Sequence, residues 1–224
     1  MLRPLTRHPR IVLHGIGLML LACLSMGISG CGGSLAREMY VCNQTSAPHV
    51  EVLRGSVGIF PGLEGFQEAL AQRGIATTIS YPEGWRNVAD RLIARRHAGD
   101  CSPIVLVGYS KGATASIHIA HALQAEGIDV DAIIILEGCH HRLIPANVHY
   151  CFNSYLPYGV PRMRGLPVSG ECSSTVIDNY DLVANDPSGH MGELRHLNLT
   201  YDSCVHDLLA EKILYGYSGA ACRR

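Results

Sequence analysis

The chain has few aromatic and few charged residues for its length. Aromatic side chains make up 6% of the 224 residues, with one tryptophan and three phenylalanines, and charged side chains make up 17%. The formal net charge is −1, and basic residues form no stripe and do not alternate with aromatic ones. Nucleic-acid binding uses such a positive surface, so the composition argues against a nucleic-acid partner. The chain also has no internal repeat and no low-complexity segment.

The nine cysteines never occur as C-x-x-C, which argues against a zinc ribbon. In an oxidising compartment, scattered cysteines predict two or three disulfides, whose pairing the sequence does not fix. Seven cysteines follow the first two, so at least one thiol is left over. The seven are Cys42, Cys101, Cys139, Cys151, Cys172, Cys204 and Cys222.

The N-terminus predicts export. Three arginines within the first ten residues precede an apolar stretch from Ile11 to Ile28, which is the pattern of a signal peptide. Ile28-Ser29-Gly30-Cys31 resembles a bacterial lipobox, which implies that Cys31 becomes the lipidated first residue of the mature chain. The alternatives are an ordinary signal peptide and an uncleaved membrane anchor, because the stretch is near the minimum length for crossing a bilayer.

This interpretation divides the chain into a lipoprotein-type signal peptide over residues 1–30, a tether over 31–48 and one domain over 49–224. The expected location is the cell envelope, on the periplasmic side or at the outer membrane, attached through lipidated Cys31. A periplasmic or secreted protein is the alternative.

From residue 49 onward, short apolar strands alternate with helical patterns for about 90 residues. Strands that are nearly all apolar indicate a parallel sheet covered on both faces, so the predicted fold class is α/β, a mostly parallel sheet in a three-layer sandwich. The expected strands are 49–53, 75–80, 103–107, 132–136, 148–155 and 175–183. The expected helices are 63–73, 85–98, 113–126 and 206–215, and residues 156–171 are expected to form a loop.

Gly108-Tyr109-Ser110-Lys111-Gly112 directly follows the apolar strand 103–107, and a helical pattern follows it. This strand–turn–helix context is typical of a nucleophile elbow, in which small residues flank a serine on a tight turn. The sequence therefore predicts Ser110 as a nucleophile, with a structural turn serine as the alternative. The backbone N–H groups of Lys111 and Gly55 are the predicted oxyanion-hole donors, because one follows the serine and the other lies in the glycine-bearing turn after the first strand.

A serine nucleophile needs a base and a group that orients the base. Glu137 ends an apolar strand and should emerge at the same sheet edge as Ser110, so it is the predicted acid. His190 lies in the turn after the last strand and is the predicted base, with His196 as the first alternative. The competing acids are Asp181, Asp178 and Asp186.

The cluster formed by Glu137, Cys139, His140 and His141 invites interpretation as a metal site. Consecutive histidines on one loop rarely face one ion, and no second ligand pair has suitable spacing. The sequence therefore predicts neither a metal nor a cofactor.

These residues together resemble the α/β-hydrolase superfamily, over residues 49–215. The resemblance rests on Val52-Leu53-Arg54-Gly55, the elbow, the apolar strand ending in Glu137, and Gly189-His190. It is nearest to small exported bacterial hydrolases and, more remotely, to thioesterase-like domains. The acid is glutamate where relatives usually have aspartate, and Arg54-Gly55 stands where many lipases have His-Gly.

The resemblance implies hydrolysis of a small-molecule ester or thioester through an acyl-serine intermediate. The irregular region 138–171 is aromatic but short, which predicts small or medium acyl groups. The alternatives are a catalytically inactive binding or scaffold lipoprotein of the envelope, and an enzyme that uses the same residues for acyl transfer or peptide cleavage.

Overall fold

The computed structural model describes residues 47–56, 62–139, 143–159 and 164–221, with side chains described up to residue 215. The expected signal peptide, most of the tether, and Cys31 lie outside this part. The strands are β1 His49–Leu53, β2 Thr77–Ser80, β3 Ile104–Tyr109, β4 Val130–Leu136, β5 Leu143–Ile144, β6 Val148–Tyr155, β7 Ser169–Gly170 and β8 Val176–Asp181. The α-helices are α1 Gly62–Ala71, α2 Trp85–His97, α3 Lys111–Ala125 and α4 Ser203–Ala221, and the 3-10 helices are η3 Pro82–Gly84, η4 His190–Glu193 and η5 Leu199–Tyr201.

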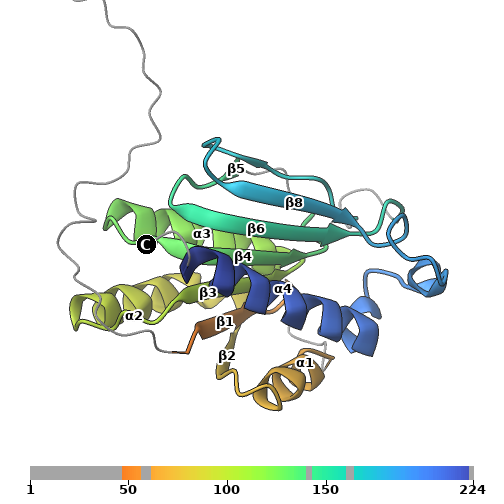
Figure 1. Ribbon diagram of the computed structural model, residues 1–224, viewed down its shortest axis with the longest axis horizontal. Coiled ribbons are helices and arrows are strands. Elements are labelled where there is room, and N and C mark those ends of the chain that lie inside the picture. The colour runs from red at the N-terminus through yellow and green to blue at the C-terminus, as the bar shows by residue number, and fades with distance from the viewer. Residues whose placement is uncertain (1–46, 57–61, 140–142, 160–163, 222–224) are drawn as a thin grey trace, which may run out of the picture.

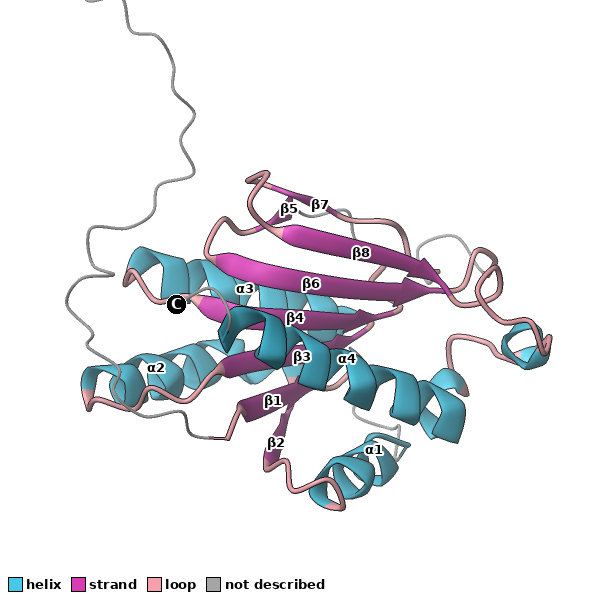
Figure 2. Cartoon of the chain, viewed as in Figure 1, coloured by secondary structure: helices cyan, strands magenta, loops and turns pink. Residues whose placement is uncertain are grey.

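Six strands form one sheet in the order β2-β1-β3-β4-β6-β8, and every neighbouring pair is parallel. Their carboxyl ends therefore meet at one edge, which is where the arrowheads lie in Figure 2. The expected mostly parallel α/β sheet is confirmed. The first strand leads outward to β2, and the chain then returns through β3 toward β8, so the order reverses beside β1 and β3.

Helices cover both faces of the sheet, as its buried strands require. Helix α4 crosses one face together with α1, and α2 and α3 cover the other (Figure 1). Alternate residues of each central strand enter the two cores: Val105 and Val107 pack on the α1/α4 side, and Leu106 packs on the α2/α3 side. Strands β3 and β4 are buried along their whole length.

Several elements differ from the sequence-based expectation. Helix α3 begins at Lys111, immediately after Ser110, because the elbow turn is tight. Helix α4 begins at Ser203 and runs to Ala221, and Asp202 caps it by accepting the Val205 N–H at 3.0 Å. The region expected to be a loop contains β7, which pairs with β5 in a separate two-stranded sheet.

The cysteines in the described part differ in whether they form disulfides. Cys101 and Cys172 are each disulfide-bonded, and Cys139, Cys151 and Cys204 are not in disulfides. Cys42 and Cys222 lie outside the described residues, so the number of disulfides stays a prediction. Within the described part, no helix combines the length and the apolar character that crossing a bilayer requires.

Candidate active site

Ser110 lies on a strained turn between β3 and α3. Its backbone has φ 53° and ψ −116°, a conformation that L residues rarely adopt, and its N–H donates to the Leu136 carbonyl at 2.9 Å. The flanking glycines are required by close packing: a Cβ on Gly112 would lie 2.1 Å from the Leu53 carbonyl oxygen, and one on Gly108 would lie 2.6 Å from the Ala113 backbone. The predicted strand–turn–helix geometry is therefore present.

The turn after β1 approaches this elbow closely. A Cβ on Gly55 would lie 2.9 Å from the Tyr109 ring and 3.5 Å from Ser110 Cβ, so only glycine fits there without displacement. Lys111 begins α3, where a backbone N–H has no partner within the helix. The side chain of Lys111 pairs with Glu83 at 2.6 Å. Both residues predicted to supply oxyanion-hole donors thus lie beside Ser110.

Glu137 directly follows β4, the strand beside β3, and is 1% exposed. Its φ of 55° is the second positive value among the described non-glycine residues. Its Oε1 accepts backbone N–H groups from Leu156 at 2.5 Å and Gly165 at 3.2 Å, which leaves Oε2 for another donor. A buried carboxylate held in this way keeps a fixed orientation.

His196 lies between Ser110 and Glu137. Its Nε2 is 3.0 Å from Ser110 Oγ, and its Nδ1 is 3.1 Å from Glu137 Oε2. With the proton on Nδ1, the ring donates to the carboxylate and presents Nε2 as an acceptor for the serine hydroxyl. This row of serine, imidazole and carboxylate can move a proton off the hydroxyl as the oxygen attacks an electrophile.

The sequence-based choice of His190 as the histidine of this row is wrong. Its Nε2 pairs with Asp202 Oδ2 at 2.6 Å, and its side chain is 43% exposed. A hydrogen bond from the ring to Asp202, with the charge of that carboxylate, raises the pKa of His190. His196, the first alternative, occupies the place expected for His190.

The path of the chain after β8 places His190 away from Ser110. The strand β8 stands three strands away from β3 at the sheet edge, a distance of about 14 Å at the usual strand spacing. The chain after β8 first turns back on itself, because the N–H groups of Asn185 and Asp186 bond to Asp181 and Val183. His190 therefore comes before the chain has crossed to Ser110. Nine residues separate His190 from the end of β8, which would be enough to cross about 14 Å if they were extended, so the turn and not the number of residues keeps His190 from Ser110.

The competing acids have other partners. Asp181 Oδ1 accepts the N–H groups of the turn after β8, and Asp178 lies 3.5 Å from Lys212. Asp186 accepts N–H groups from Ser188 and Met191. Only Glu137 among the predicted acids is hydrogen-bonded to His196 in the described part.

Two tyrosines hold the segment that carries His196. The Tyr109 hydroxyl donates to the His196 carbonyl, and the two rings pack with centroids 5.2 Å apart. Burial, reinforced by the charge of Glu137, raises the pKa of Tyr109, so its hydroxyl keeps its proton for this bond. The Tyr158 hydroxyl lies 2.8 Å from the Gly192 carbonyl oxygen, and the Arg195 guanidinium covers the Tyr158 ring.

A cysteine thiol also borders the serine. Cys139 Sγ is 3.9 Å from Ser110 Oγ and 3.3 Å from the Glu137 carbonyl oxygen. Burial raises the pKa of the Cys139 thiol, which therefore stays protonated at neutral pH. His140 and His141, which the sequence places next to it, lie outside the described residues.

A cavity of about 240 Å³ adjoins the candidate site. One wall is formed by His196 and Glu137, and the others are largely apolar. The remaining lining residues are Leu156, Tyr158, Gly159, Arg164, Arg195 and Leu197. The cavity is below the roughly 300–1,000 Å³ of drug-sized ligand sites, so it suits a small or medium group.

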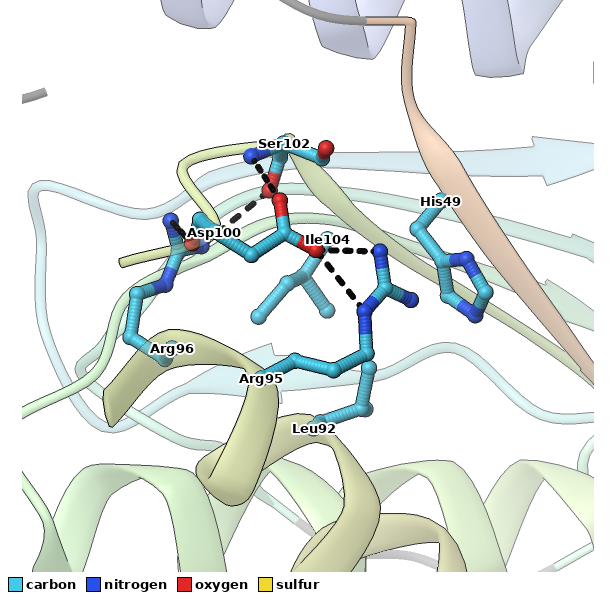
Figure 3. A pocket seen from close by; sticks show the side chains of 7 residues that line it. All are labelled: His49, Leu92, Arg95, Arg96, Asp100, Ser102 and Ile104. Carbon is cyan, nitrogen blue, oxygen red and sulfur yellow. Dashed lines mark hydrogen bonds and ion pairs between the residues drawn. The ribbon is translucent and has the colours of Figure 1, made fainter. Parts of the chain in front are cut away.

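A second cavity lies at the opposite, amino edge of the sheet, beside His49 and Ile104 (Figure 3). Its volume of about 10 Å³ leaves room for one water at most. Arg95 bonds to Asp100 Oδ2, and the Ser102 N–H donates to Asp100 Oδ1 at 2.8 Å. This cluster fastens the end of α2 to the start of β3 and is a structural feature.

No protein-family model matches the chain, and no curated protein matches it as a relative. Several solved structures are similar to it. A thioesterase from the prodiginine biosynthetic pathway of Streptomyces coelicolor is 14% identical over 76% of this chain and 87% of its own, with a TM-score of 0.44.

A protein described as an α/β-superfamily hydrolase from Xanthomonas campestris is 14% identical over 75% of this chain and 99% of its own, with a TM-score of 0.41. A cutinase-like protein from Cryptococcus sp. is 14% identical over 79% of this chain and 97% of its own, with a TM-score of 0.44.

Proposed function

We propose that this protein is a serine hydrolase that cleaves carboxylic esters or thioesters through an acyl-serine intermediate. The observation that carries the proposal is the row formed by Ser110, His196 and Glu137, with contacts of 3.0 and 3.1 Å. Every member has its orienting bonds in place before any substrate arrives. Such preorganisation supplies much of the rate enhancement of acyl-transfer enzymes.

In the proposed reaction, Ser110 Oγ attacks the acyl carbon while His196 Nε2 accepts its proton. Glu137 holds the protonated imidazole, and the N–H groups of Lys111 and Gly55 stabilise the oxyanion. His196 then protonates the leaving alcohol or thiol, which departs and leaves the acyl group on Ser110. Water, activated by the same imidazole, attacks the acyl-serine and releases the acid.

We also propose that the substrate's acyl or leaving group is small to medium in size. The cavity beside His196 supports this, since its volume of about 240 Å³ accommodates a short chain or a single ring. Its lining surface is largely apolar, although Arg164 and Arg195 are among the lining residues, so an apolar chain or ring fits it. The cavity opens beside the imidazole, which has to reach the leaving group in the second step.

The test is hydrolysis of nitrophenyl esters of increasing acyl length and of matching acyl thioesters by the purified chain. We expect short chains to react faster than palmitoyl, and Ser110→Ala to lower kcat by about 10⁴-fold or more. Rapid quenching should trap an acyl adduct that mass spectrometry places on Ser110. A folded protein with neither turnover nor adduct would instead favour the binding-protein interpretation, and acylation of an added acceptor would favour acyl transfer.

We propose further that the enzyme acts at the cell envelope, anchored through Cys31. The support is the sequence pattern alone: arginines, an apolar stretch and Ile28-Ser29-Gly30-Cys31. Expression with a labelled fatty acid tests this. Incorporation that Cys31→Ser abolishes supports the anchor, and incorporation by neither form contradicts it.

A further inference from the structure

Three potential metal ligands converge where the chain enters α4. One ring nitrogen of His190, one carboxylate oxygen of Asp202 and Sγ of Cys204 all lie within 4.8 Å of one another. His190 belongs to η4, Asp202 follows η5, and Cys204 lies in the first turn of α4. The described part of the chain contains no other group of three such ligands.

We propose that His190, Asp202 and Cys204 bind a divalent transition-metal ion, with Zn²⁺ as the best fit. Nitrogen, oxygen and sulfur donors together favour zinc over magnesium or calcium, which take oxygen ligands alone. Three protein ligands leave one tetrahedral position open to water. This site is separate from the row of Ser110, His196 and Glu137.

The donor atoms are available to an ion. Asp202 uses Oδ1 to cap α4 and turns Oδ2 toward His190, at 2.6 Å from Nε2. Cys204 is an exposed, free thiol. Zinc bonds of roughly 2.0–2.3 Å in a tetrahedron place the ligand atoms about 3.3–3.8 Å apart. The imidazole–carboxylate contact of 2.6 Å therefore has to widen by about an ångström, and the other two separations already lie within 4.8 Å, about an ångström or less beyond the required range.

The surroundings also favour a cation. Asp186 and Glu193 are close enough to act electrostatically on His190, in addition to Asp202. Each of these three charged neighbours is acidic. A divalent ion would offset this concentration of negative charge.

A metal ion at this site would join the two ends of the segment that carries His196, the base of the proposed reaction. His190 and Asp202 stand at the two ends of residues 191–201, the segment that carries His196. An ion held by both ends and by α4 would restrict that segment, because a metal bridge removes freedom from the loop it closes. We therefore infer that zinc stabilises the position of His196.

Cobalt titration of the full chain tests the site without relying on activity. Co²⁺ bound by a thiolate gives a charge-transfer absorption band that nitrogen and oxygen ligands alone do not give. We expect one equivalent of Co²⁺ to produce this band and Zn²⁺ to displace it. Cys204→Ser should abolish the band, and His190→Gln should weaken Co²⁺ binding by about tenfold or more. Asp202 is left unchanged in these variants because it caps α4.

The matched control is His149→Gln. His149 pairs with Asp129 at 3.3 Å, as His190 pairs with Asp202, but it belongs to no three-ligand group. This variant should bind Co²⁺ as the wild type does. No charge-transfer band in the wild type, or a band that survives Cys204→Ser, would overturn the proposal.

A second measurement uses the reactivity of the thiol. Zn²⁺ should slow alkylation of Cys204 by iodoacetamide by about tenfold or more, while alkylation in His190→Gln should be slowed much less. Equal alkylation rates with and without Zn²⁺ would contradict the site. Neither readout requires turnover, so failure of the proposed hydrolase function leaves this test intact.

Discussion

At the scale of single residues, backbone groups orient the polar side chains of the candidate site. Glu137 has one carboxylate oxygen occupied by the N–H groups of Leu156 and Gly165, so the other faces His196. His196 in turn has its carbonyl held by the Tyr109 hydroxyl. Rotation of either side chain would break bonds that are formed in the resting protein. The site therefore spends little free energy on ordering when substrate binds.

Tyr109 is a positioning residue in this account, and Tyr109→Phe tests it. Loss of one hydrogen bond is worth about 1 kcal/mol, so kcat should fall roughly fivefold to tenfold while KM changes little. Steady-state kinetics on a short-chain ester measures both. The matched control is Tyr180→Phe, on β8, whose ring packs on Phe152. A change in KM alone, or an equal fall in kcat for the control, would contradict the positioning role.

At the scale of elements, strain is concentrated at the ends of two neighbouring strands. Ser110 follows β3 and Glu137 follows β4, and they are the described non-glycine residues with positive φ. Each costs on the order of 1–3 kcal/mol, which the buried strands on both sides offset. The strain turns both side chains out of the sheet toward the same imidazole.

The elbow predicts a sharp intolerance at Gly112. A Cβ there would lie 2.1 Å from the Leu53 carbonyl oxygen, which is a backbone atom and cannot swing away. Gly112→Ala should therefore lower the free energy of unfolding by about 3 kcal/mol or more, as measured by urea denaturation. Gly84→Ala is the control, since a Cβ at Gly84 meets nothing within 4 Å. Comparable stability of the two variants would show that the elbow backbone is more yielding than described.

The positions of Ser110 and Glu137 could be predicted from the sequence, and the path of the chain from β8 to His196 could not. Ser110 and Glu137 each follow an apolar strand directly, so strand direction alone places them at one edge. The strands and the parallel sheet follow from the same apolar runs. His196 depends on how residues 182–195 turn before crossing the sheet, and hydrogen bonds between distant residues, such as that from Tyr109, decide that path. His190 was therefore the wrong choice for the histidine beside Ser110, because the choice rested on its proximity to the last strand.

At the scale of the whole molecule, the two edges of the sheet carry different groups of polar side chains. The carboxyl edge holds Ser110, Glu137 and the segment with His196. The amino edge is fastened by charged contacts: Glu51, fully buried, pairs with Arg91 and His49 at 2.7 Å each. These contacts join Arg91 of α2 and the first residue of β1 to the same buried carboxylate.

Asp100 makes this amino edge sensitive to acid. Burial opposes its ionisation, but hydrogen bonds from Ser102 and Arg95 outweigh burial and lower the pKa of Asp100 from 3.8 to about 2. A carboxyl with a lowered folded-state pKa stabilises the protein above pH 3.8, and this contribution is lost as the pH falls through about 2.

Asp100→Asn should therefore be less stable than the wild type at pH 7, and the difference should shrink between about pH 4 and pH 2. Urea denaturation at a series of pH values measures it. Arg95 makes an ion pair with Asp100. In a protein that already carries Arg95→Gln, the loss of stability caused by Asp100→Asn should therefore be smaller over the same pH range. A difference that stays constant down to pH 2 would refute the assignment of this acid sensitivity to Asp100.

The central claim is that His196, and not His190, activates Ser110. Labelling with a fluorophosphonate, which reacts with activated serines, tests it most directly in metal-free buffer. Wild type and His190→Ala should label at similar rates, Ser110→Ala should not label, and His196→Ala should label at least about 10³-fold more slowly. Rapid labelling of His196→Ala, or loss of labelling in a folded His190→Ala, would contradict the account.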